Sequence, residues 1–252
     1  MRQLIQSLIK RIPPVKRILD ERAYLRHLVE TMGSGFEVPM ADAIAQGKHR
    51  EAIGGRWEEM GKLQFDYLRN HGLVPHHDFL DIGCGSLRGG VKFIEYLEPG
   101  HYWGIDNNAA LLDAGWAIEL LQAGLQHRQP RRQLVCLSDF QFSELGHLFD
   151  YAIAQSVFTH LNWNKISLCL VRLAPCMRPG GKFYATFMHV PADHPFEQPM
   201  KHPLCTSYGH RDPFHYRDDD FRHAIRHLPW SVQFLGGWNH PTDTHMLEFI
   251  RL

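Results

Sequence analysis

Short apolar runs that alternate with helical patterns are the feature that most limits how this chain can fold. Helical spacing of apolar residues is found at 87–97, 109–121 and 165–177, between runs of strand length. Because strands that alternate with helices form βαβ units, we expect a parallel sheet covered by helices on both faces. The predicted strands span 79–83, 102–106, 133–138, 150–155 and 182–188.

Two further strands are predicted at the end of the sequence, at 231–238 and 245–252. Only the short stretch NHPTDT connects them, and a connection of that length favours an antiparallel pair. A helix beginning near Trp57 and ended by Gly72 is expected before the first strand. The 252 residues suffice for one α/β domain with a substantial core.

Composition narrows the function classes. Lys and Arg together number 27, as do Asp and Glu, so a net charge of zero gives no support for a nucleic-acid partner. The five cysteines are odd in number and form no C-x-x-C pair, which favours reduced thiols and a cytoplasmic location. No apolar run approaches the roughly 20 residues that a membrane-spanning helix requires.

The first 48 residues differ from the rest. We predict an N-terminal helical extension over 1–48 and the main domain over 49–252. Residues 2–12 form a basic pattern with apolar side chains at helical spacing, which permits contact with an anionic membrane surface. Packing of the apolar stripe against the protein body or a second subunit, as a dimer contact, is the favoured interpretation.

The stretch FLDIGCGSLRGG (79–90) follows the first strand and leads into a helix. Gly83 and Gly85 let the backbone turn tightly and approach a ligand. A dinucleotide fingerprint needs a third glycine three residues after the second, and Arg88 occupies that position. The carboxylate of Asp81 would repel a pyrophosphate and suits a ligand with an amino group or cationic centre.

Polar residues also stand at the ends of the next strands. Asp106 lies 21 residues after Gly85 (106 − 85), a spacing at which an acid can accept hydrogen bonds from ribose hydroxyls. Asp139 could bond an adenine amino group, with Phe140 against the ring. The predicted cofactor-binding residues are Asp81, Gly83, Gly85, Arg88, Asp106, Asn107, Asp139, Phe140, Gln155 and Ser156.

The ordered set LDIGCGSLRGG, WGIDNN, LSDF, FDYAIAQSVFTHL and CMRPGGKFYATF resembles the class I S-adenosylmethionine-dependent methyltransferases, over about residues 55–190. The resemblance implies a Rossmann-like, doubly wound seven-stranded sheet of order 3-2-1-4-5-7-6 with the seventh strand antiparallel, and S-adenosylmethionine as cofactor. By the same resemblance, Asp81 and the two glycines would surround the methionine part, Asp106 would hold the ribose, and Gln155 would line the pocket.

Transfer to an oxygen atom usually also removes a proton, and histidine is the side chain best suited to accept it near neutral pH. The candidate catalytic residues are His160, His215 and His240, with His160 first because it follows the fourth strand closely. Residues 189–215, rich in proline and histidine and without a clear period, are expected to form a lid without structure of its own. Their His and Cys spacing fits no zinc pattern, so no metal site is predicted.

We therefore expect a methyltransferase acting on a small-molecule or glycan-type acceptor, at oxygen. Two alternatives stay open: a catalytically silent cofactor-binding scaffold of the same fold, and a nicotinamide-dependent oxidoreductase. Arg88 and Asp81 count against the oxidoreductase, while the intact cofactor turn counts against the silent scaffold.

Overall fold

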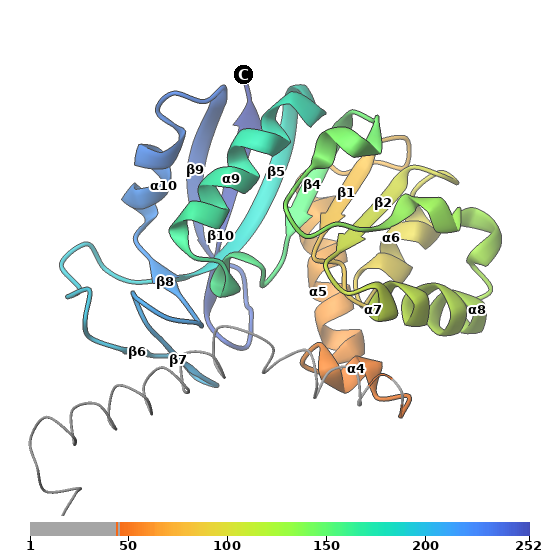
Figure 1. Cartoon of the computed structure of the whole chain (residues 1–252), viewed down its shortest axis with the longest axis horizontal. Helices are drawn as coiled ribbons and strands as arrows, with labels where there is room; N and C mark the ends of the chain where they lie inside the picture. The colour runs from red at the N-terminus through yellow and green to blue at the C-terminus, as the bar shows by residue number, and fades with distance from the viewer. Residues whose placement is uncertain (1–43, 45) are drawn as a thin grey trace, which may run out of the picture.

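A mixed sheet with helices on both faces forms the body of the protein in the computed structural model, which describes residue 44 and residues 46–252 (Figure 1). The main path of the sheet runs β3-β2-β1-β4-β5-β10-β9, and β8 pairs with β5 beside this path. With β10 as the seventh strand, this is the predicted order 3-2-1-4-5-7-6. The strands are β1 (Phe79–Ile82), β2 (Tyr102–Asp106), β3 (Leu134–Cys136), β4 (Phe149–Ala154), β5 (Met177–His189), β8 (His215–Tyr216), β9 (Trp230–Gly237) and β10 (Thr244–Arg251).

The helices divide between the two faces. One face packs against α9 and α10, and the other packs against α5, α6, α7 and α8. The helices are α4 (His49–Ala52), α5 (Trp57–Asn70), α6 (Gly90–Tyr96), α7 (Ala109–Ala114), α8 (Leu120–Gln122), α9 (Trp163–Leu173) and α10 (Asp218–Ile225). The predicted doubly wound arrangement is confirmed.

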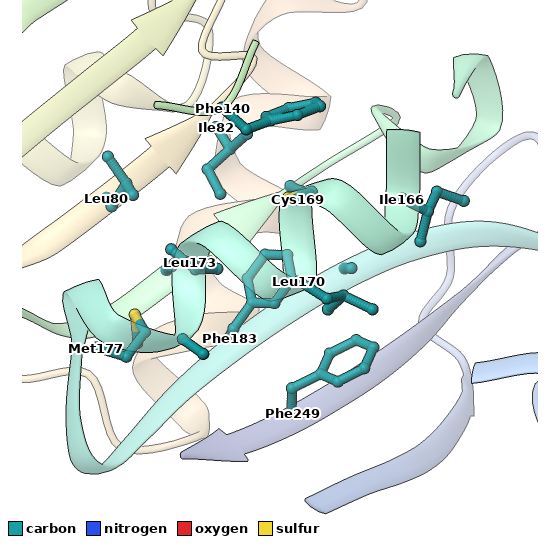
Figure 2. Close-up of a cluster of buried hydrophobic side chains, with 14 of the residues drawn as sticks. Leu80, Ile82, Phe140, Ile166, Cys169, Leu170, Leu173, Met177, Phe183 and Phe249 are labelled. Atoms are coloured by element: carbon teal, nitrogen blue, oxygen red, sulfur yellow. The ribbon is translucent and has the colours of Figure 1, made fainter. Parts of the chain in front are cut away.

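Alternating side chains along the strands build two cores. Leu80 and Ile82 of β1 join the core under α9, whereas Phe79 joins the core on the other face. Figure 2 shows side chains of α9, among them Leu170, directed at the sheet. Leu170 is fully buried, which stabilises the fold by about 1.5–3 kcal/mol.

The two closing strands are antiparallel, as predicted. β10 pairs antiparallel with β9 on one side and with β5 on the other. The helix predicted to begin near Trp57 is also confirmed as α5, and Gly72 follows its end with a φ of 98°. The sheet therefore ends in a hairpin, while β1 to β5 supply parallel strands whose carboxyl ends share one edge.

Three boundaries differ from the predictions. The helix expected over 109–121 is interrupted by a π-helical turn, Gly115–Glu119, which begins where a Cβ on Gly115 would come within 2.8 Å of Leu87 Cγ. The helix expected from 87 begins at Gly90, since the glycine turn continues to that point. The fifth strand begins at Met177 rather than 182.

The segment 189–215 is more ordered than expected, and the prediction that it has no structure of its own was wrong. It contains a hairpin of β6 (Met200–Lys201) and β7 (Thr206–Ser207), and it leads into β8, which pairs parallel to the end of β5. This order comes from strand pairing, including that of β8 with the distant β5, and such pairing leaves no pattern in the proline-rich sequence.

Predictions made for the N-terminal extension, including its membrane or dimer contact, fall almost wholly on residues 1–43 and 45, outside the described residues. Over the part of the chain that is described, no helix has both the length and the apolar character needed to cross a membrane.

Candidate active site

A cavity of about 1270 Å³ lies at the carboxyl ends of the parallel strands. It spans the point between β1 and β4 where the strand order reverses, which is where sheets of this kind bind their ligands. The structure brings most of the predicted residues to its wall. Those lining it are Asp81, Gly83, Gly85, Arg88, Asp106, Asn107, Phe140, Gln155, Ser156, His160 and His240.

The glycine turn after β1 forms the floor of one side. Gly83 and Gly85 have φ values of 73° and 55°, in the left-handed region that favours glycine. A Cβ on Gly83 would lie 2.5 Å from Val157 Cγ2, and one on Gly85 would lie 3.2 Å from Ile53 Cγ2. The turn therefore needs glycine both for its backbone angles and for the close approach of its neighbours.

Asp81 is a buried carboxyl beside this turn, with 4% of its surface exposed. Its Oδ2 accepts a hydrogen bond from the Tyr102 hydroxyl at 2.8 Å. Burial raises the pKa of Asp81 to about 7, and the nearby Asp106 adds to the rise, whereas the Tyr102 bond and Arg88 oppose it. A cationic ligand group would therefore favour the charged form of this carboxyl.

Asp106 at the end of β2 is held rigidly. Its Oδ2 accepts from the Gly85 N–H and its Oδ1 accepts from the Asn108 N–H, both at 2.9 Å. Burial raises its pKa, and these backbone N–H groups oppose the rise. Because each carboxylate oxygen can accept more than one hydrogen bond, both remain able to accept from a ligand hydroxyl.

Residues 51–56 cover the glycine turn, and sequence reasoning did not identify them. Arg88 holds this cover, since its Nη1 donates to the carbonyls of Ile53 at 3.1 Å and Gly55 at 3.0 Å. Glu51, Ala52, Ile53, Gly54 and Arg56 all line the cavity.

An acid–base cluster fixes the other end of the cover. Glu119, buried in the π-helical turn, accepts two hydrogen bonds from Arg50 at 2.7 and 2.6 Å and contacts His49 Nε2 at 2.5 Å. Arg50 and His49 lower the pKa of Glu119, against an opposing effect of burial. The only sequence signal was an acid within an otherwise amphipathic helix.

Gln155 connects Arg88 to His240 across the cavity. Its Oε1 accepts from Arg88 Nη2 at 3.1 Å and from Gln64 Nε2 at 2.9 Å, which fixes the amide orientation. Its Nε2 then lies 3.2 Å from His240 Nε2, while His240 Nδ1 accepts from the Thr242 N–H at 3.2 Å and lies 2.7 Å from the Thr242 hydroxyl. Burial, with smaller effects of Arg88 and Arg56, lowers the pKa of His240 to about 4, so it is neutral at pH 7.

Three of the six non-glycine residues with a positive φ in the described part of the chain lie at the cavity wall. Arg56, Phe140 and Ser156 have φ values of 46°, 55° and 57°, which non-glycine residues rarely adopt. All three line the cavity. Such conformations cost about 1–3 kcal/mol each and cluster at functional sites.

Two predicted residues do not reach the cavity. Asp139 is exposed and its Oδ1 accepts from Lys165 Nζ at 2.8 Å, because the start of α9 brings that lysine beside it. His215 is buried with its Nδ1 3.0 Å from the Ser207 hydroxyl, and neither residue is part of the cavity wall. The structure thus separates both from the other predicted site residues.

Comparison with known proteins agrees with this geometry. Residues 80–183 match the family model described as a methyltransferase domain. The fold is similar to that of magnesium protoporphyrin IX methyltransferase from Synechocystis PCC 6803 with bound SAM, with a TM-score of 0.56, 13% identity, and 91% of this chain and 96% of that chain covered.

Two other solved structures show the same likeness. An O-methyltransferase family protein from Burkholderia thailandensis has a TM-score of 0.61 and 13% identity, covering 95% of this chain and 71% of that chain. The glycopeptide N-methyltransferase MtfA complexed with S-adenosyl-L-homocysteine has a TM-score of 0.58 and 15% identity, covering 76% and 90%.

The sheet order and the cavity at its switch point define a class I methyltransferase fold. Residues 80–183, from β1 into β5, match a methyltransferase domain, and the sheet order is that of the class I methyltransferases, whose cofactor is S-adenosylmethionine.

The residues of this chain fit that cofactor. The glycine turn leaves space that a Cβ would fill, and the buried Asp81 and the half-buried Asp106 are acceptors at its two sides. Arg88 also has a buried Nε without a hydrogen-bond partner, which suits a carboxylate. We expect Asp81 to hold the amino group of the cofactor, Arg88 its carboxylate, and Asp106 its ribose.

Proposed function

We propose that this methyltransferase transfers the methyl group to a hydroxyl of a small polar acceptor, such as a glycan-type molecule. The observation that carries the proposal is the position of His160, which lines the cavity just after β4. It stands on the β4–β5 side, whereas the predicted cofactor residues Asp81, Asp106 and Phe140 stand at or after β1, β2 and β3.

The walls of the β4–β5 side support a polar acceptor. They carry hydrogen-bonding side chains from three separate segments, interspersed with apolar side chains such as Leu161, Met188 and Leu204. Among the described residues, Phe140 is the only Phe, Tyr or Trp lining the cavity, and it belongs to the opposite side. A flat aromatic acceptor would find no Phe, Tyr or Trp ring on this side, whereas hydroxyl groups would find donors and acceptors. The polar residues of this side are Thr159, His160, Asp212, His240, Thr242 and Thr244.

The cavity volume fits two ligands. Sites for single drug-sized ligands enclose about 300–1,000 Å³, and this cavity encloses about 1270 Å³. A cofactor against the glycine turn would therefore leave room for a small acceptor beside β4.

When bound, S-adenosylmethionine supplies an activated methyl carbon, to which the acceptor oxygen bonds while the sulfur leaves with the C–S electron pair as a thioether. The chain aligns the acceptor, excludes water and receives the hydroxyl proton. His160 is the group proposed to receive it. His240 is less suited, because its pKa of about 4 makes it a weak proton acceptor.

The proposal is tested by incubating the full chain with S-adenosylmethionine labelled in its methyl group and separate panels of acceptors. The panels are free sugars and polyols, small amines, and carboxylates. We expect label on hydroxyl acceptors, with transfer lost in His160→Gln while affinity for S-adenosylhomocysteine is retained. Label on amines alone, with normal turnover in His160→Gln, would contradict the proposed oxygen chemistry.

A further inference from the structure

Three hydrogen bonds tie the turn that carries His160 to β8 and the residues just before it. The Phe214 N–H donates to the Thr159 carbonyl at 2.7 Å. His160 Nδ1 lies 2.8 Å from Asp212 Oδ1. The Tyr216 hydroxyl donates to the carbonyl of the next residue, Leu161, at 2.5 Å. The consecutive residues Thr159, His160 and Leu161 of the turn are thus each hydrogen-bonded to a residue within 212–216.

The segment that supplies Asp212 is itself anchored. The Val190 N–H donates to the Tyr216 carbonyl at 3.0 Å, and β8 pairs with the end of β5. The Ser207 hydroxyl, fully buried, lies 2.7 Å from His202 Nε2 and 3.0 Å from His215 Nδ1. Figure 1 shows β6, β7 and β8 gathered beyond the end of β5.

We propose that Asp212 is a positioning residue that fixes the orientation and the tautomer of His160 for proton transfer from the acceptor, an inference that rests on the proposed function. Both residues line the cavity, although they lie 52 positions apart in the sequence. The segment 189–216 therefore completes the active site rather than only covering it.

The chemistry follows from the hydrogen bond. An ionised carboxylate can only accept, so His160 Nδ1 carries a proton and donates it to Asp212. In the neutral ring the lone pair is then on Nε2, which takes the acceptor's hydroxyl proton as its oxygen bonds the methyl carbon. The carboxylate also offsets the positive charge that the ring gains in this step.

Stability alone does not account for this pair. The side chains of His160 and Asp212 are 51% and 32% exposed, and pairs this open to solvent contribute little to folding. Without this pair, the bonds from Phe214 and Tyr216 to the turn and the pairing of β8 with β5 still hold the segment. Variants of Asp212 are therefore expected to fold, and a loss of function in them would report on the site.

The test combines spectroscopy and kinetics on the full chain. Long-range ¹H–¹⁵N spectra of protein labelled in histidine, with S-adenosylhomocysteine present at about pH 8.5, report which ring nitrogen carries the proton, since ordinary imidazoles are neutral there. His160→Gln identifies the His160 signals by their absence. We expect the Nδ1–H form in the natural chain and a mixed or reversed tautomer in Asp212→Asn.

Kinetics use the hydroxyl acceptor found by the labelled-methyl panels. Asp212→Asn should lower kcat by about 10- to 100-fold, within the range for general-base catalysis, and leave the acceptor KM and the affinity for S-adenosylhomocysteine within about twofold. Asp212→Glu, which keeps the charge, should recover part of kcat. Asp193→Asn, an exposed acid on the same segment, is the matched control and should change nothing.

Two results would overturn the inference: an Nε2–H tautomer in the natural chain, or a tautomer unchanged in Asp212→Asn. The spectra decide this without an acceptor. Failure of the proposed function has a different signature, namely no label transferred to any hydroxyl by the natural chain.

Discussion

Replacing the buried Asp81 with asparagine should show how much the charged carboxylate lowers the free energy of unfolding. The pKa of Asp81 is about 7 in the folded chain, against 3.8 without the fold. A shift of about three pKa units at about 1.4 kcal/mol each gives about 4 kcal/mol. Because the folded pKa is raised, the stabilising effect is present in full below about pH 4 and is lost as the pH rises through about 7.

Asp81→Asn removes this titration. The free energy of unfolding of the variant, relative to the natural chain, should therefore increase by about 2–3 kcal/mol between about pH 5 and about pH 8.5. Urea unfolding at both pH values measures the difference. Any constant cost of placing an amide beside Tyr102 cancels when the two values are subtracted. A relative stability that is the same at both pH values would refute the reasoning.

The same carboxyl should couple cofactor binding to protons. A bound ammonium group favours the ionised form, so S-adenosylhomocysteine should bind with release of a proton below about pH 7. Calorimetry in two buffers of different ionisation enthalpy measures that proton, which Asp81→Asn should abolish. Tyr102→Phe is the informative control, because loss of the hydroxyl that donates to Asp81 raises its pKa further and moves the proton release to higher pH.

Three other changes probe separate parts of the site. Asp106→Ala should weaken binding of S-adenosylhomocysteine by about 1.5–3 kcal/mol, measured by calorimetry, whereas the exposed Asp139→Asn should leave it unchanged; equal losses in both would be contrary to the geometry. Glu119→Gln should increase hydrogen exchange of the cover at 51–56, because the ion pair that anchors it is lost, and unaltered exchange would remove Glu119 from that role. His240 titrates at about 4, below its unfolded value, so stability is lost as the pH falls from about 6.5 to 4, and urea unfolding of His240→Gln should show a shallower decline than the natural chain.

The sheet and one side of the site were predictable from the sequence because their signals are local. The strands β1, β2 and β4 are short apolar runs, and Gly83, Asp106 and Gln155 stand at or directly after their ends. A parallel alignment of these strands therefore predicted one shared edge for the glycine turn at 83–85 and the carboxylate of Asp106. The helix pattern over 109–121 was equally visible, but its apolar spacing does not indicate the π-helical turn at Gly115–Glu119.

Asp139 shows where local signals mislead. Because Asp139 follows the third strand as Asp106 ends the second, both were predicted to bind the cofactor. In the structure the first turn of α9 brings Lys165 within 2.8 Å, and the carboxylate pairs with this lysine at the surface. A residue 26 positions away thus decided the direction of the side chain, and no spacing rule along the chain contains that information.

The acceptor side depends on such distant contacts throughout. His160 was recognisable as a strand-end histidine, but Asp212 stood in a proline-rich segment with no period to align it. Only the pairing of β8 with β5, and the bonds from Phe214 and Tyr216 to the turn at 159–161, place its carboxylate beside the imidazole. The cofactor side of this fold is therefore specified by residues close to each strand end, whereas the acceptor side is assembled across the chain. If that division holds, substitutions of cavity-lining residues of the segment 189–216, such as Leu204 and Asp212, should alter acceptor turnover while affinity for S-adenosylhomocysteine stays the same. Calorimetry beside kinetics on one set of variants separates the two.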